Sequence, residues 1–284
     1  MPQATPPIWS LPQAEAIAVG LMCKAPRPGH AKTRLGRTIG ADFAALLSEC
    51  FLRDVAKIIE TLQSSHNLQG YGLYAPIDAA AEIAALLPRS FRLVPQHGDD
   101  FSSIVHGAIA SLLERHRGGA MLINSDSPTL PPQILAMASD ALRRHEDCVV
   151  LGPAFDGGYY LIGLKHAHWE LFRDIPWSTN EVARMTRDRA RELDIPTVEL
   201  PMWYDVDDAA DFSRLLEEIA GVPPSFGSSG AGANGHSGEL HAAPALATRA
   251  MIKKWSQNRE LYLESDRGSK RAREIGPHAN IRDA

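Results

Sequence analysis

The segment MCKAPRPGHAKTRL, residues 22–35, directly follows the short apolar run AIAVGL of residues 16–21. The apolar run predicts a buried strand, and the prolines and glycine after it predict a loop at its carboxyl end. The loop carries four cationic side chains with no carboxylate among them: Lys24, Arg27, Lys32 and Arg34. Because open α/β sheets bind anionic ligands beyond the carboxyl ends of their strands, the segment predicts an α/β fold with a site for a nucleotide diphosphate.

The same loop contains Lys32-Thr33, the dipeptide that ends a P-loop. A P-loop has a glycine directly before that lysine, whereas Ala31 precedes Lys32 here. Pro26 and Pro28 also lack the backbone N–H groups that would bind a phosphate. The pattern therefore argues against a P-loop and leaves two interpretations: an anion site formed by side chains, or a charged loop exposed to solvent.

The composition is that of a globular protein: 284 residues, 44% hydrophobic and 22% charged, with a net charge of −5. No apolar run is long enough to span a membrane, and an acidic chain without a broad basic face is not typical of nucleic-acid binders. We therefore expect no membrane and no nucleic-acid partner. The three cysteines are widely spaced, which predicts free thiols and a cytoplasmic protein.

Short apolar runs alternate with amphipathic segments along most of the chain. The periodicity predicts helices at residues 42–62, 79–87, 102–116, 131–145, 180–193 and 209–220. It predicts strands at residues 16–21, 70–75, 91–95, 120–124, 148–151, 159–164 and 197–200. Such alternation is typical of a mostly parallel sheet flanked by helices. The two strands around residues 156–158 are too close for a helical crossover, so we expect an antiparallel excursion in a mixed sheet.

Changes in composition divide the chain into four expected parts. Residues 1–15 are an N-terminal extension without the features of a signal peptide, and residues 16–222 form the α/β domain. Residues 223–248 begin with a stretch rich in glycine, serine and proline, which is typical of a flexible linker. Residues 249–284 are basic with mixed charge and predict a disordered or partly helical tail.

Two carboxylates are candidates for a metal site. Asp126 follows the strand expected at residues 120–124, which puts it at the mouth of the sheet. Asp207 belongs to the sequence YDVDD before the last expected helix, where Asp208 is a natural N-cap. Mg²⁺ takes oxygen ligands and is commonly held by one or two carboxylates together with substrate phosphates. The alternative for each aspartate is a structural role in a turn or at a helix N-terminus.

Three further motifs lie after expected strands. Asp156 precedes two glycines, which permit a tight turn or the close approach of a ligand, so it is either a turn residue or a base for an acceptor hydroxyl. Gln96, Gly98 and Asp99 offer an amide and a carboxylate to the edge of a nucleobase. Trp177 is expected either to pack in the core or to form a wall of an acceptor pocket.

Five motifs occur in order: KAPRPGHAKTRL (24–35), NSDSP (124–128), DGGYYLIG (156–163), PWST (176–179) and DVD (205–207). Together they resemble the bacterial glycosyltransferase-A-like proteins of the selenodomain-associated or arsenosugar-biosynthesis type. Those proteins are similar in turn to guanylyltransferases of cofactor biosynthesis. The resemblance covers roughly residues 16–220 and implies a three-layer α/β/α nucleotide-diphospho-sugar transferase fold with a mixed, mostly parallel sheet.

The resemblance also implies roles for individual residues. Lys24, Lys32 and Arg34 would contact the phosphates, and Gln96, Gly98 and Asp99 match the region that contacts the base. Arg27 and Gly29 of the same loop complete the expected nucleotide site. The implied metal ligands are Asp126 and Asp207, for Mg²⁺ or Mn²⁺, and the catalytic candidates are Asp156 and Lys24. Two departures stand out: Asn124 replaces the first carboxylate of the usual D-x-D motif, and GDDFS at residues 98–102 replaces the usual GDLG, so no particular base is implied.

Three functions are compatible with these features. The first is a metal-dependent glycosyltransferase that moves a sugar from a nucleotide-diphospho-sugar to a small-molecule acceptor. The second is a nucleotidyltransferase that joins a nucleoside triphosphate to a phosphorylated small molecule and needs no protein base. The third is a nucleotide-binding regulator that docks through its basic tail. None of the motifs defines the sugar, the base or the oligomeric state.

Overall fold

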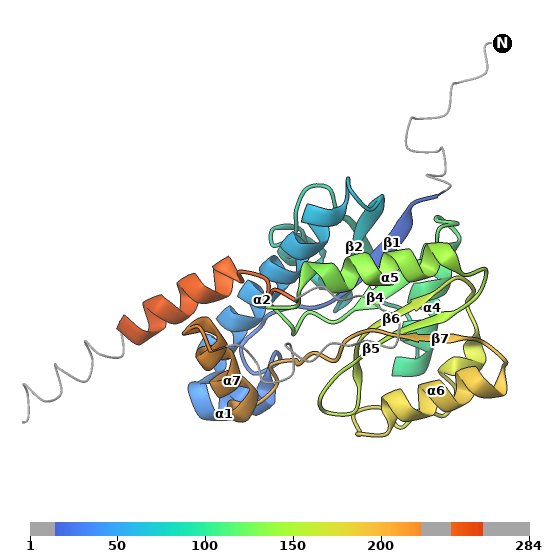
Figure 1. Cartoon of the computed structure of the whole chain (residues 1–284). Helices are drawn as coiled ribbons and strands as arrows, with labels where there is room; N and C mark the ends of the chain where they lie inside the picture. The colour runs from blue at the N-terminus through green and yellow to red at the C-terminus, as the bar shows by residue number, and fades with distance from the viewer. Residues whose placement is uncertain (1–14, 223–239, 258–284) are drawn as a thin grey trace, which may run out of the picture.

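The computed structural model describes residues 15–222 and 240–257. Within these residues the centre is a seven-stranded sheet with the order β3-β2-β1-β4-β6-β5-β7 (Figure 1). The strands are β1 (Ile17–Lys24), β2 (Leu68–Ala75), β3 (Arg92–Pro95), β4 (Ala120–Ile123), β5 (Val149–Pro153), β6 (Tyr159–Leu164) and β7 (Thr197–Glu199). β6 runs antiparallel to both β4 and β5, and the other neighbours are parallel. The expected mixed sheet is confirmed.

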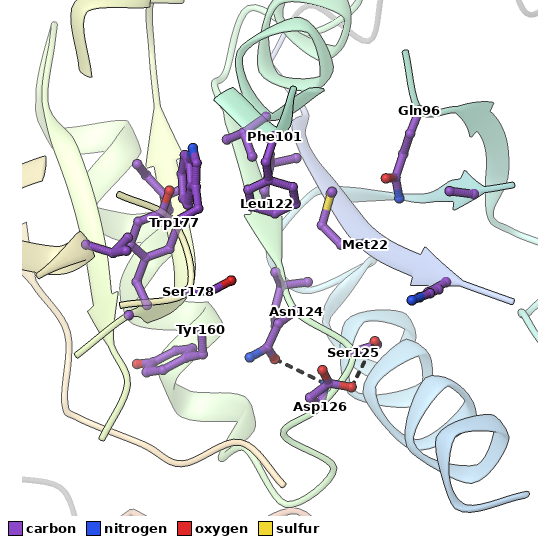
Figure 2. A pocket seen from close by; sticks show the side chains of 18 of the residues that line it. Met22, Gln96, Phe101, Leu122, Asn124, Ser125, Asp126, Tyr160, Trp177 and Ser178 are labelled. Carbon is purple, nitrogen blue, oxygen red and sulfur yellow. Dashed lines mark hydrogen bonds between the residues drawn. The ribbon is translucent and has the colours of Figure 1, made fainter. Parts of the chain in front are cut away.

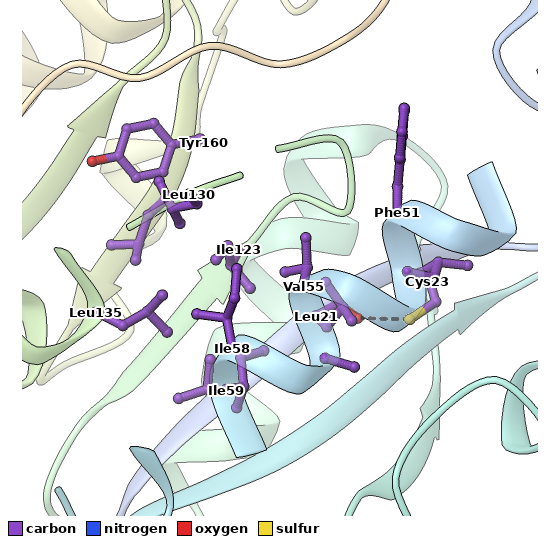
Figure 3. Close-up of a cluster of buried hydrophobic side chains, with 14 of the residues drawn as sticks. Leu21, Cys23, Phe51, Val55, Ile58, Ile59, Ile123, Leu130, Leu135 and Tyr160 are labelled. Carbon is purple, nitrogen blue, oxygen red and sulfur yellow. Dashed lines mark hydrogen bonds between the residues drawn. The ribbon is translucent and has the colours of Figure 1, made fainter. Parts of the chain in front are cut away.

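Helices cover both faces of this sheet and complete three α/β/α layers (Figure 1). One layer contains α2 (Ala41–Leu62) and α5 (Pro132–Arg144), and the other contains α4 (Phe101–Leu113) and α6 (Val182–Glu192). Side chains alternate between the two layers along the strands: Val19 and Leu21 pack on the α2 side, and Ala18 packs on the α4 side. Figure 3 shows part of the larger cluster, where Ile58 and Ile59 of α2 lie against the sheet.

The smaller elements are α1 (Thr33–Ile39), α3 (Ala80–Ala84), α7 (Ala209–Ile219) and two short 3-10 helices at Ile77–Ala79 and Trp169–Leu171. The long predicted helices are confirmed, because α2, α4, α5, α6 and α7 overlap the expected ranges. α1 was not expected, since Gly36 in its middle lowers the helical propensity of a short segment. Gly40, with a φ of 93°, separates α1 from α2.

Residues 240–257 pack against the domain. Residues 246–257 form a helix, drawn orange-red beside α2 in Figure 1. The ring of Trp255 stacks on Phe43 of α2 with centroids 4.7 Å apart. The carboxylate of Asp54, also on α2, accepts hydrogen bonds from the backbone N–H groups of Ala247 and Thr248 at 2.9 and 2.8 Å. Asp54 therefore supplies acceptors to N–H groups that have no partner within the first turn of that helix.

This packing corrects one expected boundary. The expected linker, residues 223–248, was based on its glycine and serine content, but residues 240–248 join the helix in covering α2. Residues 1–14, 223–239 and 258–284 lie outside the described residues. Among the residues described, no helix has the length and apolar character needed to cross a membrane, and the three cysteines are buried free thiols, as expected.

We expect Asp54→Ala to lower the free energy of unfolding by about 1–2 kcal/mol, because two N–H groups at a helix N-terminus lose their acceptor. Urea unfolding of the full chain measures this loss. Asp42→Ala is the matched control, since Asp42 is an exposed aspartate in the first turn of the same helix, α2. Equal losses for the two variants would contradict the assigned role of Asp54.

Candidate functional site

A cavity of about 730 Å³ lies at the carboxyl ends of β1 and β4 (Figure 2). Five of the predicted site residues line it: Lys24, Arg27, Gln96, Asp126 and Asp156. The other six are outside its lining: Gly29, Lys32, Arg34, Gly98, Asp99 and Asp207. The position agrees with the general rule that open α/β sheets bind ligands beyond the carboxyl ends of their strands.

The cationic loop meets carboxylates that are distant in sequence. Arg27 pairs with Asp78 at 3.3 Å and with Glu82 at 3.1 Å. Its side chain is 39% exposed, and such exposed pairs contribute little stability, so the guanidinium can exchange these partners for a phosphate at small cost. Lys24 ends β1, is exposed and lines the cavity. Gly29 has a φ of 75°, in the left-handed region that favours glycine, and turns the chain toward Lys32.

Lys32 joins the loop to the two predicted metal ligands. Its Nζ lies 2.8 Å from Asp126 Oδ2 and 2.8 Å from Asp207 Oδ1, and its side chain is only 5% exposed. Arg34 Nη2 lies 2.5 Å from Asp207 Oδ2 and is far more exposed. Residues from the start, middle and end of the domain thus converge, but Lys32 and Arg34 contact carboxylates rather than an open phosphate site.

The charges in this cluster stabilise one another. Burial disfavours the charged form of Lys32, but Asp126 and Asp207 outweigh it and raise the pKa of Lys32. Burial likewise acts to raise the pKa of Asp207, but Lys32 and Arg34 outweigh it and hold that pKa below its usual value. Lys32 and Asp207 therefore both stay charged at neutral pH.

The donor set around Asp126 fits a divalent cation that is shared with a ligand. Asp126 and Asp207 direct one oxygen each at the same positive charge, and Asp126 also lines the cavity. Asn124 adds no charge, and its Oδ1 accepts the Asp126 N–H at 3.3 Å. In the described part of the chain, no group of three or more acidic, histidine or cysteine side chains is arranged to hold a metal. A cation here would therefore need phosphate oxygens to complete its ligands.

Asp205 belongs to the same electrostatic cluster, although it was not among the predicted site residues. Burial is the main cause that raises its pKa to about 7, followed by the negative charges of Asp207, Asp156 and Asp126. Four carboxylates therefore affect one another at this edge of the sheet. The sequence signal was the alternation in DVD, since side chains two residues apart in an extended segment share a side.

The raised pKa of Asp205 predicts a pH dependence of stability. The folded protein binds this proton more tightly than the unfolded chain, in which the carboxyl has an ordinary pKa of 3.8. Its stabilising contribution is therefore complete below about pH 4 and is lost as the pH rises toward 7. The full difference in pKa corresponds to about 4 kcal/mol, and we reduce it by half because Asp205 is partly exposed to solvent. We therefore expect Asp205→Asn to raise the free energy of unfolding at pH 8 by about 2 kcal/mol and to change it little at pH 4.

Urea unfolding at pH 4 and pH 8 tests this prediction. Asp174→Asn is a suitable control, because the side chain of Asp174 is 80% exposed. An Asp205→Asn variant that follows the wild-type pH profile would contradict the prediction.

Asp156 occupies a tight turn between β5 and β6. Its Oδ1 accepts the Gly158 N–H at 2.8 Å. Gly157 has a φ of 87°, and a Cβ at this position would lie 2.2 Å from the carbonyl oxygen of Asn180. Glycine is therefore required where the turn docks before α6. Asp156 is thus a turn residue, as one of the two expected alternatives has it, and its carboxylate also lines the cavity.

The three residues predicted to contact the base, Gln96, Gly98 and Asp99, do not lie together at the cavity. Gln96 lines the cavity and donates a hydrogen bond from Nε2 to Leu73 O at 2.6 Å. Gly98 instead packs against the first turn of α4, where an added Cβ would lie 2.6 Å from Ser103 Oγ. Asp99 is exposed outside the cavity lining. Gly98 therefore permits close packing of the backbone on α4, and Gln96 alone of the three predicted residues remains beside the cavity.

The cavity also has an apolar side, for which the motifs offered only Trp177. Trp177 lines it, together with Phe101 and Val105 from α4. The sequence left Trp177 between packing and pocket wall, and in the structure it does both, because it lines the cavity and packs against the buried cluster on the α4 side of the sheet. Phe101 could have been noticed in sequence as a large apolar residue in the first turn of a helix that follows a strand end.

A family model described as "Uncharacterized protein conserved in bacteria (DUF2064)" matches residues 58–179, a range that includes Asp126 and Asp156. The chain is also similar to the crystal structure of a candidate nucleotide-diphospho-sugar transferase from Desulfovibrio desulfuricans G20. The two are 26% identical with a TM-score of 0.67, and the match covers 85% of this chain and 98% of that one. No protein of curated function matches the sequence.

More distant similarity extends to two nucleotide-dependent synthases. One is CMP:2-keto-3-deoxy-manno-octonic acid synthetase in complex with CTP, at 10% identity and a TM-score of 0.47, covering 72% of this chain and 99% of that one. The other is a 4-diphosphocytidyl-2C-methyl-D-erythritol synthase from Anaerococcus prevotii DSM 20548, at 9% identity and a TM-score of 0.46, covering 72% of this chain and 96% of that one. These values are too low to support a functional argument.

Proposed function

We propose that the protein is a metal-dependent glycosyltransferase that moves a sugar from a nucleotide-diphospho-sugar to a small-molecule acceptor. One observation carries the proposal: a single cavity at the carboxyl edge of the sheet has Lys24, Asp126 and Asp156 on its wall. These residues offer a cation for a phosphate, a ligand for a metal and a base for a hydroxyl. The similarity to the Desulfovibrio protein supports the same class of donor.

The loop of residues 24–34 is the proposed site of the diphosphate. In sugar transfer the departing nucleoside diphosphate gains negative charge, and preorganised cations stabilise that charge. Lys24 lies on the cavity wall, and Arg27 needs only to exchange its exposed pairs with Asp78 and Glu82. Lys32 fixes the carboxylates next to this loop and is not itself on the cavity wall.

Asp126 and Asp207 are the proposed ligands of Mg²⁺ or Mn²⁺, with the substrate phosphates as further ligands. When bound, such a cation supplies Lewis-acid stabilisation to the leaving diphosphate. Asp126 contributes from the cavity wall, and Asp207 contributes from the segment before α7, which the Asp208 N-cap holds in place. Lys32 and Arg34 limit the repulsion between the two carboxylates when no cation is present.

Asp156 is the proposed base. Its Oδ1 is engaged by the Gly158 N–H, which fixes the side chain and leaves Oδ2 for the proton of an acceptor hydroxyl. A positioned carboxylate of this kind takes up the proton as the new glycosidic bond forms.

Product analysis tests the reaction class. The full chain is incubated with Mn²⁺ and each of several nucleotide-diphospho-sugars, or with nucleoside triphosphates and sugar phosphates, and the products are separated by anion-exchange chromatography. We expect one nucleotide sugar to release its nucleoside diphosphate faster than in a matched Asp126→Asn sample, with water as the slow acceptor. Release of pyrophosphate from a triphosphate would contradict glycosyl transfer and indicate the alternative, a nucleotidyltransferase. Binding of nucleotide without any product would indicate the third reading, a regulator.

A further inference from the structure

The inner part of the cavity is lined by apolar side chains from three strands and one helix. Met22 of β1, Leu122 of β4 and Ile162 of β6 form its floor, and Val105 of α4 closes one side. Figure 2 shows Met22 and Leu122 beneath Phe101, with Trp177 facing them. No charged side chain of the described residues belongs to this inner part, since the charged lining residues lie at the last residue of β1, Lys24, or in the loops at the sheet edge.

The aromatic wall of this inner part is held rigidly. The indole N–H of Trp177 donates to Ser102 Oγ at 2.8 Å, and Ser102 Oγ donates in turn to Phe172 O at 2.6 Å. The rings of Phe101 and Trp177 meet edge to face with centroids 4.8 Å apart. The wall is therefore preorganised, and the binding of a ligand costs little conformational entropy in these side chains.

Phe101 is the most informative residue of the wall. It is 46% exposed although it lies beside a cavity with an apolar floor. Covering the exposed part of this ring with an apolar ligand removes apolar surface from water, which is the main favourable contribution to binding in such pockets. A ligand rich in hydroxyl groups would instead lose its hydrogen bonds to water when it binds next to Met22, Leu122 and Ile162, because these side chains have no hydrogen-bonding groups to replace them.

Most polar groups of the lining lie at the rim, but Tyr159 also lines the cavity, and its hydroxyl is buried without a hydrogen-bond partner among the described residues. Asp156, Asn124 and Ser178 lie where the cavity meets the sheet edge, and Figure 2 shows Ser178 and Asn124 below Trp177 and Leu122. An occupant that fits both parts has an apolar body for the floor and one polar group for the rim. The carboxylates at the rim also disfavour an anionic group there.

We infer that the acceptor is a small neutral alcohol with an aromatic or aliphatic body, bound against the wall that Phe101 and Trp177 form together, with its hydroxyl directed to Asp156. This inference rests on the proposed glycosyl transfer and names the class of its acceptor. In the transfer, the hydroxyl oxygen forms the bond to the sugar, its proton passes to Asp156, and the bond from the sugar to the diphosphate breaks. A sugar or other polyol is not the acceptor.

The test uses 2-phenylethanol as probe and glucose as the polyol, with binding to the full chain measured by saturation-transfer NMR titration. We expect 2-phenylethanol to bind at least about tenfold more tightly than glucose. Phe101→Ala should lower the affinity for the alcohol by about tenfold, because part of the apolar surface that covers the bound alcohol is lost. Phe155→Ala is the matched control, since Phe155 is 44% exposed and is not part of the cavity lining, and it should leave the affinity unchanged.

Three results would overturn the inference. The first is that glucose binds as tightly as 2-phenylethanol, and the second is that Phe101→Ala binds the alcohol as tightly as Phe155→Ala does. The third is that a nucleoside diphosphate displaces the alcohol. The last result would assign the apolar part to the donor. The melting temperature of the same samples with nucleotide and Mn²⁺ separates the two proposals. Nucleotide binding without alcohol binding would defeat only the acceptor class, and alcohol binding without nucleotide binding would defeat the proposed function.

Discussion

Asp156→Asn is expected to lower the rate of sugar transfer by about 10²–10⁴-fold, the usual contribution of a positioned general base. The amide keeps the size of the side chain and can still accept the Gly158 N–H that holds the turn. It cannot take up the proton of an acceptor hydroxyl. The affinity for the nucleotide should therefore change little, and the loss should appear in kcat, measured with the donor found by product analysis.

Asp174→Asn is the control for this variant, because Asp174 is an aspartate that is 80% exposed and lies outside the cavity lining. Its activity should equal that of the wild type. A loss of less than about tenfold in Asp156→Asn would contradict a role as base. Such a result would favour nucleotidyl transfer, where the attacking group is a substrate phosphate that is already deprotonated.

Lys32→Met is expected to lower the free energy of unfolding by about 2 kcal/mol at pH 7. Removing one partner of a buried ion pair typically costs about 3–5 kcal/mol, and we reduce that figure because the side chains of Asp126 and Asp207 are 30% and 26% exposed. Without the ammonium, two carboxylates that shared one cation repel each other. Millimolar Mn²⁺ should restore part of the loss, since a divalent cation can replace the missing charge.

Arg34→Met provides a close comparison, because Arg34 pairs with the same Asp207 but is 64% exposed. Exposed ion pairs contribute about 0–1 kcal/mol, so this variant should lose much less stability than Lys32→Met in urea unfolding. Equal losses of stability in the two variants would contradict the role assigned to the buried lysine. An equal response of the two variants to Mn²⁺ would contradict it as well.

Much of the fold was predictable from local sequence. β1 and β4 are short apolar runs that end at polar loops, and a strand buried on both faces has this pattern. The antiparallel pairing of β5 and β6 followed from the short connection between them, residues 154–158, since a parallel crossover needs a longer connection. α1 was missed because Gly36 and Gly40 interrupt a short helix whose stability depends on packing rather than propensity.

The pairings inside the site were not predictable in the same way. The loop appeared to have no neutralising carboxylate because Asp207, the partner of Lys32, lies 175 positions away. Asp54 and Ala247 are 193 positions apart, so the composition of residues 223–248 could not indicate that their last part packs on α2. The prediction that Asp126 and Asp207 share one site came from the family resemblance and from the place of Asp126 after an expected strand, and in the structure both carboxylates contact Lys32.

The measurement that tests the central claim most directly is the melting temperature of the full chain with nucleoside triphosphates and nucleotide-diphospho-sugars, each with and without Mn²⁺. A ligand that binds only the folded state at about 100 times its Kd stabilises it by about 2.7 kcal/mol, which is a rise of several degrees for a domain of this size. We predict such a rise with one nucleotide sugar, dependent on Mn²⁺, larger than with the free nucleotide and absent in Asp126→Asn. No rise with any nucleotide, in a sample that unfolds cooperatively, would contradict a nucleotide site at the cationic loop.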